Sequence, residues 1–214
     1  MTVQAVTQEW VNMNNNADAT PASEGQARAS TYSLIAALLA RPPSDALMQS
    51  LTRIPQRSNH DDGTMALAWE ALRDAGEAAP IAEILKHEYH DLFIGIGRGE
   101  LLPFGSWYQT GFLMDRPLSL LRDDLKRLGF ERQDEVKEPE DHIAALCETM
   151  AMIIADQRIA FAQQRAFFRD HIGCWAGQFF SDLAQADHAT FYRAVGSFGG
   201  HFIQFENRYL EMLA

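Results

Sequence analysis

The amino-acid sequence predicts an all-α protein, built as a single helical bundle. Apolar residues recur at three- and four-residue spacing along most of the chain, which is the period of a buried helical face. No stretch sustains the alternation of apolar and polar residues that a half-buried strand requires. Prolines and glycines separate the periodic stretches, as expected where helices are joined by turns. These three features together favour helices packed around one core.

The first expected element is an arm without regular structure. Residues 1–23 begin with a short apolar stretch and continue in small polar residues without periodicity, so we expect this arm to be flexible. Trp10 lies on it and could cover a hydrophobic groove, although an untethered tail is the simpler expectation. Amphipathic helices then follow in the first half of the chain, within residues 23–45, 44–54, 64–75 and 80–96.

A hydrophobic loop is expected next, over residues 95–115. Its sequence, GIGRGELLPFGSWYQTGFLMD, contains five glycines and a proline, which disfavour a regular helix, yet it is rich in large apolar side chains. A helix is expected again over 116–129, and a charged, hinge-like connector over 130–139. We therefore expect one domain over 24–214, with halves at about 24–130 and 139–214.

Three helical segments are expected in the second half, within residues 141–157, 160–186 and 190–213. The first follows the acidic stretch KEPEDH. Pro139 suits the first turn of a helix, and Glu140 and Asp141 would face the positive end of its dipole. Capping rules do not require a histidine at His142, so the stretch is either a helix start alone or a helix start that is also a site.

Composition limits the possible partners. The net charge of -11 and the pI near 5.0 argue against a nucleic-acid or anionic-membrane surface and favour a basic partner. The N-terminus has no basic start followed by an apolar run, and no stretch is apolar enough to span a membrane, so we expect a cytoplasmic protein. Cys147 and Cys174 fall on apolar helical faces, which favours reduced, buried thiols.

The usual enzyme motifs are incomplete. The run GIGRGE has Glu100 where a dinucleotide-binding loop has its last glycine, and no Gly-Lys pair marks a phosphate loop. Ser106, Asp141 and His142 could suggest a hydrolytic triad, but adjacent residues at a helix start point about 100° apart. We expect no enzyme and no cofactor.

A metal site is the remaining alternative of this kind. No histidine has a glutamate three residues before it, which excludes the usual di-iron motif of helical bundles. His87 and His90 could still offer ligands from neighbouring turns of one helix, which leaves a helical metal-binding protein as an alternative.

Several motifs, in order along the chain, resemble one family. The runs EYHDLFIGIGRGELLPFGSWY, EPEDH, FFRDHIGCWAGQFF and FYRAVGSF, with the early RASTYSLIAALLARPPSD, are similar to the TorD/DmsD family of redox-enzyme maturation chaperones. The resemblance covers nearly the whole chain from about residue 24. It implies a TorD-like helical fold and binding of the twin-arginine signal peptide of a molybdoenzyme precursor, which is held until its cofactor is inserted and before export.

The resemblance also implies site residues. The family's peptide-binding determinants match Asp141 and His142 of the acidic stretch and the loop residues Pro103, Phe104, Gly105 and Ser106. A basic, apolar leader peptide needs acids beside an apolar groove. The acids available are Glu138, Glu140 and Asp141, and the groove could be formed by Phe104, Trp107, Tyr108 and Phe112.

Two questions stay open at this point. A relative of the same family could serve a membrane-anchored nitrate reductase, whose client has no export leader. The connector could also let the two halves exchange between protomers, so that monomer and domain-swapped homodimer both form.

Overall fold

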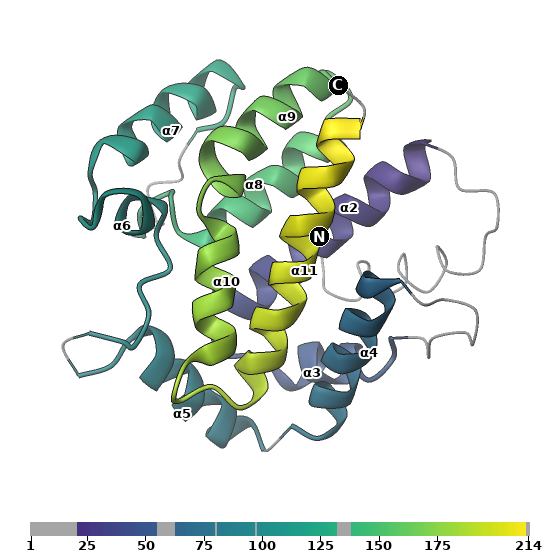
Figure 1. The fold of residues 1–214 in the computed structure, drawn as a ribbon, viewed down its shortest axis with the longest axis vertical. Coiled ribbons are helices and arrows are strands. Elements are labelled where there is room, and N and C mark those ends of the chain that lie inside the picture. Colours follow the sequence, from purple (N-terminus) through teal and green to yellow (C-terminus); the bar gives the residue numbers. More distant parts are fainter. Residues whose placement is uncertain (1–20, 55–62, 80, 97, 132–137, 213–214) are drawn as a thin grey trace.

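The protein is described here from a computed structural model, over residues 21–54, 63–79, 81–96, 98–131 and 138–212 (Figure 1). The helices of the first half are α2 (Pro21–Leu39), α3 (Asp45–Leu51), α4 (Thr64–Glu77), α5 (Ala82–Phe93), α6 (Gly105–Thr110) and α7 (Arg116–Arg127). Those of the second half are α8 (Ile143–Ala155), α9 (Phe161–Phe168), the π-helical turn η1 (Arg169–Gly173), α10 (Ala176–Gln185) and α11 (Phe191–Met212). No strand forms in these ranges, which confirms the all-α prediction.

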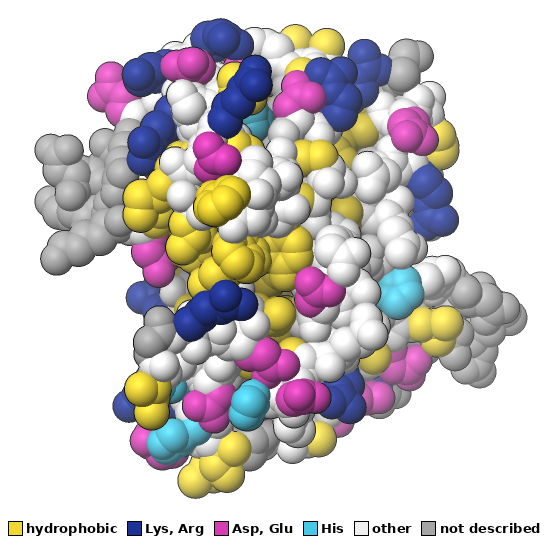
Figure 2. All heavy atoms as spheres, turned by 60° about the vertical axis from the view of Figure 1, so that its left-hand side comes forward, with side chains coloured by type: hydrophobic (Ala, Val, Ile, Leu, Met, Phe, Trp, Pro, Cys, Tyr) yellow, Lys and Arg dark blue, Asp and Glu magenta, His cyan; other side chains and the backbone are white. Residues whose placement is uncertain are grey.

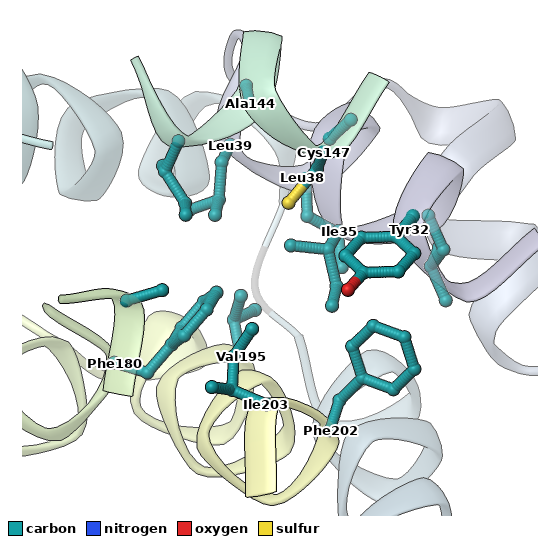
Figure 3. Packing of buried hydrophobic residues seen from close by; sticks show 14 of the residues in the cluster. Tyr32, Ile35, Leu38, Leu39, Ala144, Cys147, Phe180, Val195, Phe202 and Ile203 are labelled. Carbon is teal, nitrogen blue, oxygen red and sulfur yellow. The ribbon is translucent and has the colours of Figure 1, made fainter. Parts of the chain in front are cut away.

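The two halves of the chain share one core. α2 packs along α8, and α11 packs against both α10 and α4, so the two halves meet at two interfaces, α2 with α8 and α4 with α11 (Figure 1). At the centre, side chains of α2 face those of α8, α10 and α11 (Figure 3). The fully buried side chains there include Tyr32, Ile35, Leu38, Cys147, Phe180 and Val195.

One buried charge network ties α2 to α11. Glu206 of α11 is completely buried and accepts two hydrogen bonds from the Arg28 guanidinium, at 2.7 and 2.9 Å. The Tyr32 hydroxyl donates a third, at 3.0 Å. Burial, followed by the nearby Glu206 charge, raises the pKa of Tyr32 well above its usual value. The carboxylate is thus fully satisfied by groups from the other half of the chain.

Glycines on α11 let α10 approach closely. A Cβ at Gly196 would lie 2.5 Å from the backbone nitrogen of Ala184, and one at Gly199 would lie 2.2 Å from the Phe180 ring. Because backbone cannot shift out of the way as a flexible side chain can, Gly196 is the stricter requirement. The start of α11 is held by Glu88 of α5, whose carboxylate accepts the backbone N–H groups of Thr190 and Tyr192.

Four details differ from the sequence-based expectations. The loop expected over 95–115 contains the short helix α6, and the segment 160–186 is interrupted by η1. α8 begins at Ile143 with His142 as its N-cap, so Glu140 and Asp141 precede its first turn. Cys147 is buried as expected, whereas Cys174 is exposed.

Parts of the expected arm and connector cannot be compared. α2 begins at Pro21, within the expected arm, whose residues 1–20 lie outside the described residues, as do 132–137 of the connector. Among the helices that are described, none is long and apolar enough to cross a bilayer.

Candidate functional site

The loop before α6 and the acidic stretch before α8 meet directly. The backbone N–H of Ile143 donates to the Pro103 carbonyl, and that of Gly105 donates to the Asp141 carbonyl, both at 2.9 Å. Phe104 and His142 thereby form an isolated antiparallel bridge. Main-chain hydrogen bonds thus hold side by side two segments that are separated along the chain by α6, α7 and the connector.

Asp141 is the buried acid of this junction, with only 3% of its surface exposed. Its Oδ2 accepts the backbone N–H of Ser106 at 2.7 Å, so a carboxylate from a distant segment satisfies one of the free N–H groups at the start of α6. Its Oδ1 is buried and has no hydrogen-bond partner among the residues that the structure describes. A buried carboxylate oxygen without a donor is uncommon, because desolvating it costs free energy.

His142 and Ser106 complete the junction. The His142 ring caps α8, because its Nδ1 accepts the backbone N–H of Ala144 at 3.1 Å. Burial lowers the pKa of His142 below its usual value, which favours the neutral ring that this cap requires. The His142 ring also meets the Phe104 ring edge to face, at 5.1 Å. The fully buried Ser106 accepts the backbone N–H of Met114 through its Oγ.

Beside this junction runs a groove with a volume of about 830 Å³. It lies between the end of α2, the C-terminal part of α7, the connector and one face of α8. Its lining combines apolar side chains with charged ones: Leu125, Phe130, Ala144, Ala145 and Met152 with Glu131, Glu138, Glu140, Glu148, Arg122 and Lys126, together with His142. The groove therefore has four acids and two bases around an apolar floor.

The sequence pointed to only part of this groove. Glu138, Glu140 and His142 were expected at the site, but Glu148, Leu125 and Phe130 were not. One signal could have indicated Glu148: it lies midway between Ala144 and Met152 at four-residue spacing, on one face of α8. No sequence pattern set Leu125 and Phe130 apart, and only the fold places them opposite α8.

Glu140 already has a cationic partner. The Arg122 guanidinium of α7 donates to both oxygens of its carboxylate, at 2.8 to 3.1 Å. The hydrogen bond to Glu140 is the largest cause that raises the pKa of Arg122, and the charge of Asp141 adds to it. Since Arg122 is 45% exposed, this is an ion pair at the groove wall rather than in the core.

The four expected aromatic residues do not form one surface. Tyr108 is attached to α10, because its hydroxyl donates to Asp182 at 3.0 Å and its ring stacks on Trp175. Trp107 is half-buried under the Arg98 guanidinium, 5.1 Å from the ring centroid. Phe112 is exposed, and Phe104 contacts His142. None of the four lines the acidic groove.

Apolar side chains do gather on the face that carries α6. Figure 2 shows hydrophobic side chains across the middle of this face, seen from the left-hand side of Figure 1. Phe112, Leu113 and Met114, just after α6, are all exposed, from 44% to 71%. This face is separate from the acidic groove and is a second apolar surface beside the junction.

The structure gives no support to a metal site at His87 and His90. The His87 Nδ1 lies 2.7 Å from the backbone oxygen of Glu83, and the His90 Nδ1 lies 3.5 Å from the carboxylate of Asp91. No three potential ligands from His, Cys, Asp and Glu come together in the described ranges. The two histidines belong to an exposed face of α5.

Comparisons with known proteins identify the family. The sequence pattern of the family described as nitrate reductase delta subunit matches residues 58–181, more than half of the chain. The chaperone protein TorD of Vibrio parahaemolyticus is 24% identical over 181 residues, which cover 79% of this chain and 74% of that protein. The probable Tat proofreading chaperone DmsD of Haemophilus influenzae is 30% identical over 113 residues, 52% of this chain and 54% of that protein.

The chain belongs to the nitrate reductase delta subunit family, which confirms the resemblance to TorD and DmsD. Another TorD relative, from Vibrio cholerae, is 27% identical, and the match covers 60% of this chain and 63% of that protein. The chain thus spans about three quarters of the first relative and less than two thirds of the others. These relatives are named as chaperones and not as enzymes, which supports the prediction of a chaperone.

Proposed function

We propose that the protein is a cytoplasmic chaperone that binds the twin-arginine signal peptide, the catalytic subunit, or both, of a molybdoenzyme precursor. It would hold the precursor until the molybdenum cofactor is inserted and before export. The observation that carries this proposal is the acid-lined apolar groove beside the Pro103–Ser106 and Asp141–His142 junction. The names of two relatives, a TorD chaperone and a probable Tat proofreading chaperone, support the same function.

The groove and the leader peptide have complementary chemistry. A twin-arginine leader combines a basic start with an apolar segment that tends toward helix, so its receptor needs acids next to an apolar channel. Glu138, Glu140 and Glu148 supply carboxylates, and the apolar floor, which includes Leu125 and Met152, supplies apolar contact. The net charge of -11 would also speed association with a basic peptide, in a manner that weakens with added salt.

In this proposal, an arginine of the leader takes the position that the Arg122 side chain occupies in the groove. The Arg122 guanidinium lies on Glu140 and interacts with the charge of Asp141. A guanidinium of the leader could replace it, pairing with Glu140 and donating to the Asp141 Oδ1. Because Asp141 is buried, this second contact requires a small opening of the junction, which the unsatisfied oxygen would favour.

A second candidate is an assembly chaperone for a nitrate reductase, whose client has no export leader. The description of the matching family, nitrate reductase delta subunit, favours it. In that case the exposed apolar residues Phe112, Leu113 and Met114 would contact the folded body of the client, and the groove would take an internal basic segment.

Calorimetric titration would test the proposal. The purified protein is titrated with synthetic twin-arginine leaders from the molybdoenzyme genes of its source organism, and with one leader whose sequence is scrambled. We expect one leader to bind with micromolar or tighter affinity and the scrambled leader not to bind. If no leader binds to the folded protein, the proposal for the signal peptide is wrong and the nitrate reductase candidate gains support.

A matched pair of variants locates the binding. Asp141→Asn removes the charge of the buried acid, whereas Asp123→Asn makes the same chemical change at an exposed position of α7 that does not line the groove. Weaker binding in the first variant alone would support Asp141 as part of the site. Light scattering of the same samples would show whether a homodimer, which domain swapping requires, forms beside the monomer.

A further inference from the structure

A second groove lies on the opposite part of the bundle, between α2, α4 and α11. It has a volume of about 510 Å³, within the range of about 300–1,000 Å³ that is typical of ligand pockets. Its walls are largely aromatic and thioether side chains: Trp69, Met65, Phe202, Phe205, Tyr209 and Met212. Phe205 stacks on both Phe202 and Tyr209, so the wall on α11 is a continuous aromatic surface.

The polar groups at this groove are already occupied within the chain. Arg28 is paired with Glu206 and lies over the Tyr209 ring at 4.5 Å. Glu24, the acid of the described lining, accepts a hydrogen bond from the Tyr209 hydroxyl at 3.3 Å. The groove therefore offers apolar surface and little charge, which does not suit a basic leader but suits an apolar segment without Lys or Arg.

The chain itself contains such a segment. Residues 1–20 lie outside the described part of the chain, and they contain no lysine or arginine. Val3, Val6, Trp10 and Met13 recur at intervals of three, four and three residues, the spacing of one helical face, and the residues between them are polar except Ala5 and Val11. This is the pattern that recognition of a helix in an apolar groove requires.

The place where the described chain begins makes this contact possible. α2 starts at Pro21, and Glu24, one turn later, lines the groove. The seven residues from Asn14 to Thr20 can span roughly 23 Å when extended, at about 3.3 Å each, and they are small and polar. Such a short linker also gives the segment an effective concentration on the order of millimolar at the groove.

We propose that residues 3–13 of the same chain cover this groove, with the Trp10 indole seated on the aromatic surface of α11 and against α4. The contact is intramolecular and protects an aromatic surface that would otherwise associate with other apolar surfaces. It is distinct from the proposed leader-binding groove, with which it shares no lining residue.

Fluorine NMR of the full chain labelled with 5-fluorotryptophan tests this proposal. The four tryptophans give separate signals, and the Trp10→Phe variant assigns the signal of Trp10. We expect this signal to be broad and shifted from that of a free peptide of residues 1–20, and to stay so on tenfold dilution. A signal at the position of the free peptide would overturn the proposal, and a shift that disappears on dilution would assign the groove to a second copy instead.

Two substitutions on one helix provide the control. Met65→Glu places a charge in the groove, whereas Leu67→Glu places one at a side chain of α4 that is 48% exposed and does not line it. We expect the first variant alone to return the Trp10 signal to the position of the free peptide. Val6→Asp, which changes only the segment, should do the same while the signals of Trp107 and Trp175, which lie outside the groove lining, stay in place. If Met65→Glu and Val6→Asp both leave the Trp10 signal unchanged, the proposal is wrong.

Discussion

Among the described residues, three carboxylates are buried, those of Glu88, Asp141 and Glu206, and the surroundings of the last two differ most. Glu206 has no exposed surface, and both of its oxygens are bound, by the Arg28 guanidinium and the Tyr32 hydroxyl. Asp141 has 3% of its surface exposed, and only its Oδ2 is bound, by the N–H of Ser106. Its Oδ1 finds no donor within the described ranges. One acid is fully satisfied inside the core, and the other is half satisfied beside a groove.

This difference separates a role in folding from a role in binding. A buried charge with a complete set of donors holds two helices in one arrangement, and removing a partner is costly because the remaining charge is left unpaired. A buried oxygen without a donor costs the fold free energy, and this cost is recovered when a donor arrives and forms a hydrogen bond. The first two predictions below test whether Glu206 acts in folding and Asp141 in binding.

The largest expected effect is on stability, at Glu206. Glu206→Gln removes the charge that compensates Arg28 in the core, and we expect the free energy of unfolding to fall by about 3–5 kcal/mol. Urea unfolding, followed by circular dichroism, measures this change. If the variant is as stable as the unmodified protein, Glu206 does not hold α2 to α11 as described.

The next effect is on binding, at Asp141. Asp141→Asn keeps an oxygen for the Ser106 N–H and removes a buried negative charge, so we expect the stability to change by less than about 1 kcal/mol. Leader affinity should fall by about 1–3 kcal/mol, as measured by calorimetry, because a partly desolvated charge pair is lost. Unchanged affinity in a folded variant would remove Asp141 from the site.

A smaller effect of opposite sign is expected at Arg122. Arg122→Ala removes the internal competitor for Glu140, and leader affinity should then rise by up to about 1 kcal/mol, the usual size of an exposed ion pair. Arg127→Ala, on the same helix but outside the groove lining, is the matched control. Weaker leader binding in Arg122→Ala would mean that Arg122 contacts the leader instead of competing with a leader arginine for Glu140.

The smallest effect concerns a half-buried acid, Glu100. It accepts hydrogen bonds from the His188 ring and from the backbone of Asp187 and His188. Although partial burial alone would raise the pKa of Glu100, these hydrogen bonds lower it below 4.5. The hydrogen bond to Glu100 raises the pKa of His188 above 6.5.

The pair therefore stabilises the fold within a defined pH window. The stabilisation by His188 is complete below pH 6.5 and is lost as the pH rises through the folded-state pKa of His188. The stabilisation by Glu100 is complete above pH 4.5 and is lost as the pH falls through the folded-state pKa of Glu100. We expect His188→Gln to lower the melting temperature most between pH 4.5 and 6.5. An equal loss at pH 9 would show that the charge of His188 does not matter.

The regular helices could be predicted from the sequence because their signals are local. Apolar spacing placed α4, α8 and α11 within a few residues of their observed bounds. The short helix α6 was missed, because Gly105 and Gly111 suggested a loop. Its first turn is held by Asp141, 35 residues away along the chain, and no local pattern contains that contact.

The candidate site, too, could be predicted from the sequence only in part. The resemblance indicated the residues of the junction, and charge indicated Glu138 and Glu140. Which aromatic side chains face which surface depended on distant partners, such as Asp182 for Tyr108, so the expected aromatic groove was not found. The groove that does exist has walls from α2, α7 and α8, and spacing along one segment could not show that they meet.

The central claim is that a leader peptide binds in the groove beside Asp141. Its most direct test is to follow the backbone amide signals of the ¹⁵N-labelled protein by NMR while the leader that binds is added. The largest shifts should fall on residues 138–148 and on the C-terminal part of α7. Shifts confined to the exposed residues after α6, or to α4 and α11, would contradict the claim and place the leader on another surface.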